Sequence, residues 1–327
     1  MKPARLSLVW LGAGVAAVAV ALVLGVSLGP VSLPPFEVAK QLLGFDTGLS
    51  QLEVGIITQI RLPRVLLGLI VGAMLALAGG CFQGVFRNPL ADPYLLGIAA
   101  GAGLGATTAI AMRADQAIIP IVAFLGAMVS AALTYLLGQG RNLILAGVAV
   151  SSFLAAVQTY VLQRNVDTIR EVYSWLLGRL DTHGYREINL LLPYALIATI
   201  VVLALRRELD ALSVGDAEAA SLGLHPQRSR LILLTAAALG TAAAVAVSGL
   251  IGFVGIIVPH IVRLLAGGSY RSILPLSVLF GAAFLALVDL AARTLVAPGE
   301  LPIGVVTAFF GAPFFVLVLR VTRTVSL

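Results

Sequence analysis

Continuous apolar runs of about twenty residues constrain what this chain can fold into more than any other feature. The stretch Leu8–Leu28 is one such run, and similar runs recur along the 327 residues. A helix of that length crosses a bilayer core, whereas the strands of a membrane barrel would alternate apolar and polar residues. Hydrophobic residues make up 60% of the chain and charged residues 11%, a balance outside that of soluble domains. The sequence therefore predicts an all-α polytopic membrane protein.

The runs divide into about ten candidate spans within a single transmembrane domain, residues 1–327. A basic N-terminus precedes the first run, which is longer than the core of a signal peptide, so we interpret it as a span. One nearly continuous run is divided near Gly252, and the short segment after it contains His260 and Arg263. The candidate spans are 8–29, 64–86, 93–112, 117–138, 143–163, 188–206, 230–250, 254–267, 274–296 and 303–321.

Ten spans place both termini on the same side of the membrane. With the N-terminus inside, 12 Lys and Arg residues fall on the inner side and 9 on the outer side. Because basic residues favour the cytoplasmic side, we expect a multi-pass protein of the cytoplasmic (inner) membrane with both termini in the cytoplasm. The arginines are spread between apolar runs and are not clustered, which argues against a nucleic-acid partner.

The outer stretch 164–187 is polar but carries Val172, Trp175, Leu176 and Leu177. This mixture predicts a short helix that lies at the membrane interface.

The inner stretch 206–230 is the longest polar segment of the chain. Asp216 is expected to cap a short helix, Ala217–Leu222, that ends at Gly223. Two interpretations remain open: a docking point for a cytoplasmic partner, or an ordinary structured loop.

A faint repeat suggests two related halves, because three residues recur at a constant offset of 170. In a ten-span chain the two segments would run in opposite directions, which predicts an inverted repeat of five plus five spans. The pairs are Ala76 and Ala246, Gly79 and Gly249, and Pro89 and Pro259.

Several kinds of chemistry are missing from the sequence. Neither Lys2 nor Lys40 follows a glycine, so the chain has no phosphate-binding P-loop for ATP hydrolysis. The three histidines lie on separate segments without metal-ligand spacing, and the single Cys81 excludes an internal disulfide or a cysteine-rich metal site. We therefore expect no metal and no cofactor on this chain.

The segment Arg87–Pro93 joins the second and third spans and contains two prolines. Irregular backbone at membrane depth is tolerated where protein buries it or where it lines a cavity. The segment is therefore a candidate gate, or else a tight turn in which Asp92 caps the third span; Asp92 could serve in both.

Three of the outer arginines lie at the ends of the second and ninth spans, against the orientation rule. Arg61 and Arg64 flank the start of the second span, and Arg293 ends the ninth, four residues after Asp289. A positive outer rim would attract an acidic docking protein, whereas snorkelling to the interface would need no partner. An i, i+4 ion pair is expected between Asp289 and Arg293.

Four long motifs in order make this chain resemble the FecCD/BtuC family of ABC importer permeases, the membrane subunits for uptake of iron-siderophores, haem and vitamin B12. The resemblance covers about residues 55–320. The motifs are Ile60-Arg-Leu-Pro-Arg-Val-Leu66, Arg87-Asn-Pro-Leu-Ala-Asp-Pro-Tyr-Leu-Leu-Gly97, Gly252-Phe-Val-Gly-Ile-Ile-Val-Pro-His-Ile-Val-Arg263 and Glu300-Leu-Pro-Ile-Gly-Val-Val-Thr-Ala-Phe-Phe-Gly-Ala-Pro313.

The resemblance implies a homodimer of ten-helix subunits with the substrate path at the dimer axis. It also implies two cytoplasmic ABC ATPase subunits, which bind ATP-Mg, and an extracytoplasmic substrate-binding protein. The arginines Arg61, Arg64 and Arg293 match positions that receive the binding protein in the vitamin B12 member.

The resemblance further assigns a coupling region and a gate. Glu218-Ala219-Ala220 with Gly223 is similar to the importer EAA motif, but the glycine comes one residue early, so the region is carried over without individual roles. The implied coupling residues are Asp216, Ala217, Glu218, Ala219, Ala220, Ser221, Leu222, Gly223 and Leu224, and the implied gate residues are Asn88, Pro89, Leu90, Gly140, Arg141 and Asn142.

The expected function is transport without bond chemistry: the permease subunit of an importer for a metal chelate, with ferric siderophore favoured and haem or cobalamin next. A proton-coupled secondary transporter is the alternative. It would need a coupling site inside the membrane, for which Asp289 and His260 are the candidates.

Overall fold

The structure, a computed structural model, describes residues 7–138, 142–297 and 299–325, including all of their side chains except those of 315 and 317–325. Within these ranges the chain is helical and has no strand. Seven of the described helices have the length and apolar composition to cross a membrane. Three shorter apolar helices, Ile98–Ala111, Val254–Ala266 and Ile303–Phe314, lie where the remaining spans are predicted.

The helical segments follow the predicted order. They are α1 (Leu8–Ser27), α2 (Pro35–Leu42), α3 (Gln51–Gly55), η1 (Ile56–Arg61), α4 (Leu62–Phe86), η2 (Pro93–Leu96), α5 (Ile98–Ala111), α6 (Ile119–Leu137), α7 (Leu143–Arg164), η4 (Val166–Thr168), α8 (Ile169–Leu176), α9 (Arg186–Ala204), α10 (Arg206–Val214), α11 (Asp216–Ser221), α12 (Pro226–Ser248), α13 (Val254–Ala266), α14 (Tyr270–Thr294) and α15 (Ile303–Val325).

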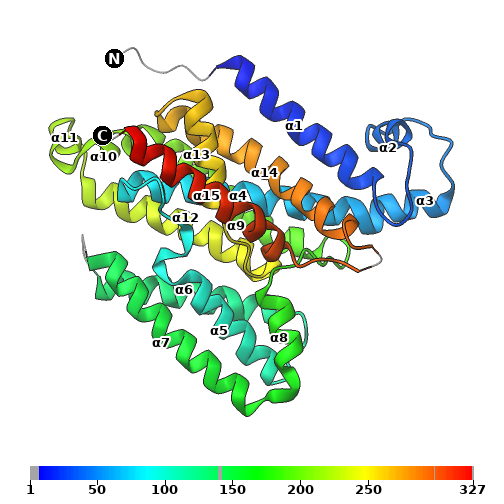
Figure 1. Ribbon diagram of the computed structural model, residues 1–327, viewed down its shortest axis with the longest axis horizontal. Helices are drawn as coiled ribbons and strands as arrows, with labels where there is room; N and C mark the ends of the chain where they lie inside the picture. The colour runs from blue at the N-terminus through cyan, green and yellow to red at the C-terminus, as the bar shows by residue number, and fades with distance from the viewer. Residues whose placement is uncertain (1–6, 139–141, 298, 326–327) are drawn as a thin grey trace.

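The helices form a bundle whose two ends carry different small elements (Figure 1). The first turn of α1, the last turn of α15, and helices α10 and α11 lie at one end, which we call the α11 end. Helices α2 and α3 lie at the opposite end, which we call the α2 end. Both chain ends and the loop 206–230 therefore share one end of the bundle, as the span count predicts.

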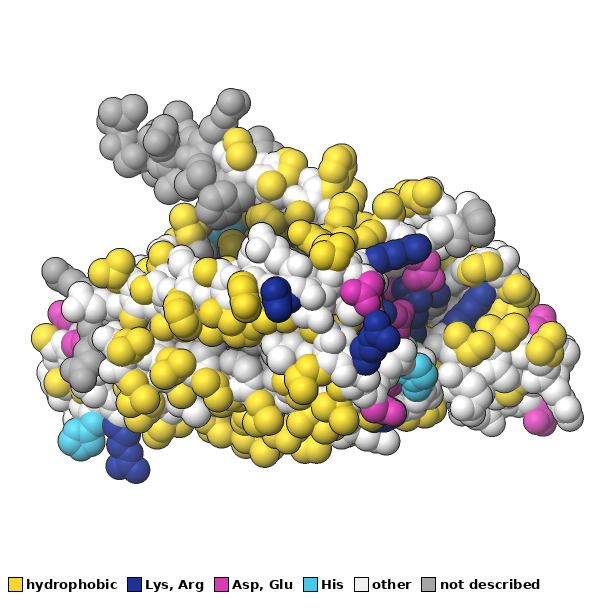
Figure 2. Space-filling view, turned by 90° about the horizontal axis from the view of Figure 1, so that it is seen from below, with side chains coloured by type: hydrophobic (Ala, Val, Ile, Leu, Met, Phe, Trp, Pro, Cys, Tyr) yellow, Lys and Arg dark blue, Asp and Glu magenta, His cyan; other side chains and the backbone are white. Residues whose placement is uncertain are grey.

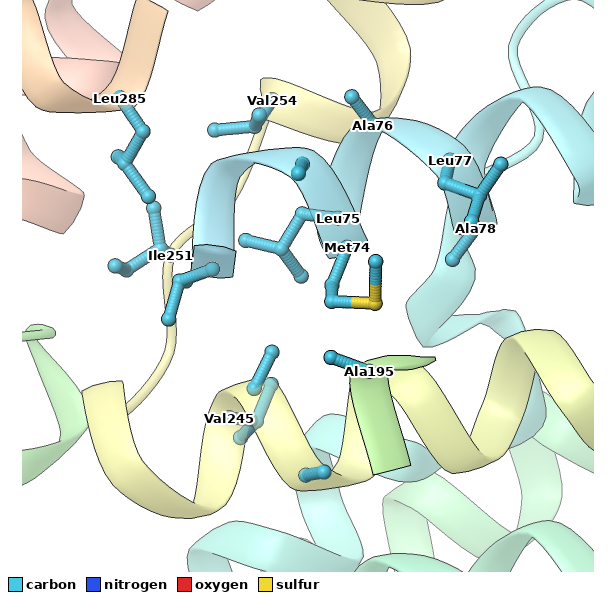
Figure 3. Close-up of a cluster of buried hydrophobic side chains, with 14 of the residues drawn as sticks. Met74, Leu75, Ala76, Leu77, Ala78, Ala195, Val245, Ile251, Val254 and Leu285 are labelled. Carbon is cyan, nitrogen blue, oxygen red and sulfur yellow. The ribbon is translucent and has the colours of Figure 1, made fainter. Parts of the chain in front are cut away.

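Helix α4 occupies the centre of the bundle. Its middle turns lie among side chains from α9, α12, α13 and α14 (Figure 3). Met74 and Leu75 in these turns are almost completely buried, as are Val245 and Leu285 opposite them. An apolar helix buried on all sides is the expected core of a membrane bundle.

Two glycines let neighbouring helices approach α4 closely. A Cβ at Gly72 would lie 2.2 Å from the carbonyl oxygen of Gly281 in α14, and one at Gly79 would lie 1.9 Å from that of Gly255 in α13. Small residues at such crossings are typical of membrane helix pairs.

The predicted break near Gly252 is confirmed, because α12 ends at Ser248 and α13 begins at Val254. Gly249 and Phe253 both have a φ of 68°, which ends one helix and redirects the chain into the next. The segment between them is held by Tyr94, whose hydroxyl donates to the Ile251 carbonyl at 3.0 Å and accepts from the Ile251 N–H at 3.2 Å.

The third predicted span, 93–112, begins later than expected. Residues Pro93–Leu96 form a 3-10 turn, Gly97 has a φ of 75°, and the α-helix starts at Ile98. Asp92 caps this 3-10 turn by accepting a hydrogen bond from the Tyr94 N–H at 2.7 Å. The capping prediction is therefore correct for the turn but wrong for the span.

Three short helices were not predicted: α2, α3 and α10. Helix α2 starts at a proline and pairs Glu37 in its first turn with Lys40 in its last, at 2.9 Å. The hydrogen bond from Lys40 and a weaker one from the Gly48 N–H hold the pKa of Glu37 below its usual value.

The predicted helix in 164–187 is present as α8, with Val172 and Trp175 facing inward.

Two of the three pairs in the repeat with an offset of 170 do not share a conformation, whereas Ala76 and Ala246 both lie inside helices. Gly79 lies inside α4, but Gly249 ends α12; Pro89 lies in a turn, but Pro259 lies inside α13. These pairs are therefore not equivalent positions, and the inverted repeat stays a prediction.

Candidate functional site

Arg61 is buried at the α2 end, with 5% of its surface exposed. Its guanidinium donates to the carbonyl oxygens of Val26 at 2.9 Å and Ser27 at 3.0 Å, and also to that of Val31. The last carbonyls of a helix have no partner within the helix and carry partial negative charge. Arg61 therefore closes the C-terminal end of α1.

Arg293 closes the same helix end from the other side. It is 6% exposed and donates to the Leu28 carbonyl at 3.3 Å and to that of Gly25. Its Nε lies 3.3 Å from a carboxylate oxygen of Asp289, so the predicted i, i+4 ion pair is confirmed. The snorkelling alternative is wrong for Arg61 and Arg293, because both guanidinium groups point into the protein.

Arg64 differs from the other two arginines because it links a buried carboxylate to an exposed one. It donates to Asp289, which is 1% exposed, at 2.9 Å and 3.1 Å, and to Glu300, which is 51% exposed, at 2.8 Å and 3.1 Å. We call Arg64, Asp289, Arg293 and Glu300 the outer charge cluster. Figure 2 shows that charged side chains gather in one region of the face it presents, with hydrophobic side chains over most of the remainder.

At the α11 end, Asp216 is the first residue of α11 and makes no capping hydrogen bond. The capping prediction for Asp216 is wrong: Gly215 precedes the helix, and the Asp216 carboxylate instead pairs with Arg87 and, at 2.9 Å, with Arg230. The predicted end of the helix at Gly223 is confirmed, with a φ of 79°.

Most residues of α11 and of the turn that follows it are exposed on the protein surface. Ala219 is completely buried, Asp216 and Leu224 are partly buried, and the remaining predicted coupling residues are exposed. Leu222 has 71% of its surface exposed. The exposed members are Ala217, Glu218, Ala220, Ser221, Leu222 and Gly223.

The first predicted gate segment forms a tight turn after α4. Arg87 has a φ of 52°, the Asn88 N–H donates back to the Gln83 carbonyl at 3.1 Å, and the Leu90 N–H donates to the Asn88 side chain at 2.9 Å. Asn88 and Pro89 are exposed and Leu90 is partly buried. This conformation fits both the gate and the turn interpretation.

Of the second predicted gate segment, Gly140 and Arg141 lie outside the described residues. Asn142 directly precedes α7 and is exposed. A cleft of about 990 Å³ is lined by Arg87, Asp216 and Arg230 together with Gly138 and Leu143. The structure thus brings the surroundings of both gate segments together with the coupling helix.

Helix α7 has the least buried apolar window of the seven span-length helices, at 11%. Three of its exposed residues, Ser152, Thr159 and Gln163, are polar and lie on one face because they are seven and four positions apart. The Thr159 hydroxyl already donates to the Ala155 carbonyl at 2.9 Å, and exposed Leu145 lies on the same face, so this face is mixed in polarity. The exposed Gln163 amide would be unfavourable against lipid, which suits the face to a second protein surface or a water-filled path.

The residues that a secondary transporter would need are not together. Asp289 is bound by Arg64 and Arg293, whereas His260 lies on α13 with its ring edge against Phe314, 6.1 Å between centroids. Among the residues that the structure describes, no group of three or more His, Cys, Asp or Glu side chains could hold a metal ion.

Sequence reasoning missed the partners of several polar side chains. Tyr94 holds the α12–α13 break, and Asp210 joins α10 to α14 by accepting from the Tyr270 N–H at 2.6 Å and from Ser269 at 2.9 Å. Arg87 belongs to the predicted gate motif, but no local sequence pattern predicts its ion pair with Asp216, which is 129 positions away.

Residues 17–321 match the FecCD transport family. The chain belongs to this family. Among its relatives, the cobalamin import system permease protein BtuC of Halobacterium salinarum is 40% identical over 280 residues, covering 84% of this chain and 75% of that protein. The Fe(3+)-citrate import system permease protein YfmE of Bacillus subtilis is 36% identical over 305 residues, covering 91% of this chain and 90% of that protein.

A solved structure titled "An inward-facing conformation of a putative metal-chelate type ABC transporter" has a TM-score of 0.87 to this chain. It is 31% identical, with 95% of this chain and 99% of the other covered. This FecCD chain is therefore a multi-pass membrane protein and a permease of a metal-chelate ABC importer.

Proposed function

We propose that this chain forms the membrane path of a binding-protein-dependent importer as a homodimer, with ten spans per subunit and the α11 end in the cytoplasm. Ferric siderophore is the favoured substrate, and haem or cobalamin come next. The observation that carries the proposal is the exposed helix α11, which is placed on a family permease that has no P-loop of its own.

The ATPase partner is inferred from α11 and the end of the bundle that carries it. A short helix with one buried residue and an exposed apolar Leu222 is suited to insertion into a groove of another protein. With ATP-Mg bound on that separate subunit, this chain needs no cofactor. The mild excess of basic residues on the side of both termini supports a cytoplasmic α11 end.

The second copy is inferred from the exposed face of α7. Ser152, Thr159 and Gln163 would line the path between two subunits, where water and a polar chelate could bond to Ser152 and Gln163. The Thr159 hydroxyl already donates to the Ala155 carbonyl. A heterodimer with a related permease would use the same face, and chemical cross-linking of a singly expressed chain distinguishes the two arrangements.

The docking surface for the substrate-binding protein is proposed at Arg61, Arg64 and Arg293. Arg64 would make the direct contact, because its current exposed partner is a half-exposed glutamate on the same chain. Arg61 and Arg293 would act by holding the end of α1 in place beside it. The gate is proposed at Asn88, Pro89 and Leu90, with Gly140, Arg141 and Asn142 as its second half.

The decisive experiment reconstitutes the chain in liposomes with and without its ATPase and binding protein, and measures uptake of labelled chelates. We expect uptake only when the ATPase, the binding protein and ATP are all present, with a ferric siderophore giving the highest rate. Uptake by the chain alone, driven by a pH gradient, would instead support a secondary transporter. A matched control omits only ATP.

A further inference from the structure

One carboxylate joins the coupling helix to the rest of the protein through two arginines. Asp216, the first residue of α11, is bonded to the guanidinium of Arg87, and a second arginine, Arg230 in the second turn of α12, bonds to it at 2.9 Å and 3.1 Å. The two arginines belong to different parts of the bundle, so the carboxylate is a junction between three segments.

Arg87 directly precedes the predicted gate turn in the sequence. It has a φ of 52° at the end of α4 and is followed directly by Asn88 and Pro89. Its side chain also donates from Nε to the Leu212 carbonyl at 2.8 Å, in the last turns of α10. Because Arg87 is joined directly to Asn88, a movement of its guanidinium can be passed through its backbone to the gate turn.

Helix α11 has few other attachments. Its buried residue is Ala219, and its main helix neighbours are α10 and α12. Within residues 7–138, 142–297 and 299–325, the only side-chain bonds from α11 to other segments are those of Asp216 to Arg87 and Arg230. Asp216 is thus the one side-chain connection from this helix to the gate turn.

The bonds of the two arginines to Asp216 differ in how accessible they are to water. Arg230 is 15% exposed, whereas Arg87 is 39% exposed and Asp216 is 45% exposed. Ion pairs that water can reach are weak and exchange readily, and burial strengthens them. Asp216 can therefore release Arg87 while it keeps Arg230, which gives the junction two arrangements.

We infer that Asp216 is a positioning residue that transmits the movement of α11 to the gate turn through its bond with Arg87. The inference rests on the proposed importer function, in which the ATPase moves α11. When Asp216 holds Arg87, the gate turn follows the helix; when it holds Arg230 alone, the turn is released. The bond with Arg230 keeps α11 attached to α12 in both arrangements.

The test compares Asp216→Asn with Arg228→Gln in the full complex reconstituted in liposomes. Asn keeps the shape of the side chain and removes the charge that holds both arginines. Arg228→Gln is the matched control, because Arg228 is exposed in the first turn of α12 and makes no side-chain bond among the described residues. The measured quantity is the amount of chelate moved per ATP hydrolysed, together with the melting temperature of each variant.

We expect Asp216→Asn to keep ATP hydrolysis and to lower chelate moved per ATP by roughly fivefold or more, the range of an ordinary coupling energy. Arg228→Gln should keep the ratio near wild type. Arg87→Gln should lower the ratio to a similar extent, and the double variant of Arg87 and Asp216 should be no worse than either single variant.

An unchanged ratio in Asp216→Asn, alongside ATP-dependent uptake in wild type, overturns the inference and leaves the proposed function intact. Equal losses of ATP hydrolysis and uptake also overturn it, because they indicate loss of ATPase binding. Failure of the wild-type complex to import with ATP would remove the proposed function itself. A fall in melting temperature without a change in the ratio would assign Asp216 a structural role alone.

Discussion

At the α2 end, Arg61 and Arg293 are 5% and 6% exposed and bond to backbone carbonyls, whereas at the α11 end Arg87 is 39% exposed and divides its bonds between the Leu212 carbonyl and a half-exposed carboxylate. Both ends use arginine to join segments that are far apart in sequence. The surroundings differ: the carbonyls at the end of α1 and the buried Asp289 belong to helices of 20 and 25 residues, but Asp216 lies on a helix of 6 residues with few attachments.

This difference suggests that the α2 end holds a fixed geometry and that the α11 end can change its contacts. A buried charge that loses its partner is costly, so the arginines of the outer charge cluster and Arg61 fix the geometry of one end. Water-accessible ion pairs contribute little to stability and can exchange partners, which suits an end that must respond to another protein. The predictions below alter each end in turn, from the largest expected effect to the smallest.

The largest effect is expected for Asp289→Asn. The substitution removes the only carboxylate bonded to Arg293 among the described residues and one of two bonded to Arg64, leaving a buried guanidinium without a counter-charge. Breaking such a buried pair should lower the free energy of unfolding by about 3–5 kcal/mol. Thermal melting of the detergent-purified chain measures the loss. Glu300→Gln is the control at the exposed side of the same cluster and should cost less than about 1 kcal/mol; equal melting of both variants would contradict the structural role of the buried half.

A smaller loss is expected for Arg61→Gln. The side chain gives up bonds to the carbonyls of Val26, Ser27 and Val31, and the end of α1 then keeps only Arg293 as a cationic partner among the described residues. The glutamine amide and water can satisfy some of these carbonyls, so we expect a net loss of about 1.5–3 kcal/mol, the contribution of one hydrogen bond to a charged group. Limited proteolysis after α1, combined with thermal melting, reports the change. A melting temperature equal to that of wild type would show that Arg61 does not stabilise this helix end.

The next largest effect is expected for binding of the substrate-binding protein, which should depend on Arg64. Because its Glu300 partner is half exposed, a carboxylate of the binding protein can reach the same guanidinium. Arg64→Gln should weaken binding of the substrate-binding protein by about tenfold, roughly 1.4 kcal/mol, and reduce the dependence of binding on salt. Surface plasmon resonance on nanodisc-embedded permease measures both. Unchanged affinity at low salt would sink the docking proposal for this residue.

The smallest stability change is expected at the α11 end. Arg87→Gln should alter the free energy of unfolding by no more than about 1 kcal/mol, because its ion pair with Asp216 is accessible to water. The measurement is thermal melting beside Asp289→Asn. A loss as large as that of Asp289→Asn would remove the contrast between the two ends.

Much of the fold follows from local signals in the sequence. Apolar runs located the spans, and the glycine at 252 marked the α12–α13 break. Gly223 marked the end of α11, because a glycine readily adopts the positive φ that terminates a helix. Helix α10 was missed because its polar surface gives no apolar run, and the turn before α5 was missed because hydropathy does not distinguish a 3-10 segment from a helix.

The candidate sites were harder to predict than the fold. The pairing of Asp289 with Arg293 could be foreseen because it is local, at i, i+4. The partners of Arg61 are backbone carbonyls 30 to 35 positions away, and every residue type carries a carbonyl, so no sequence pattern marks them. Asp216 fitted the pattern of a helix cap, but two arginines distant in sequence hold its carboxylate instead.

The most direct test of a responsive α11 end and a fixed α2 end is cysteine labelling of the complete complex. In a Cys81→Ser background, a single cysteine replaces either Asn88 in the gate turn or Val31 beside Arg61, both of which are exposed. Maleimide labelling is measured with and without ATP. Our account predicts an ATP-dependent change in labelling rate at position 88 and the same rate at position 31. Equal rates with and without ATP at position 88, or a larger change at position 31, would contradict it.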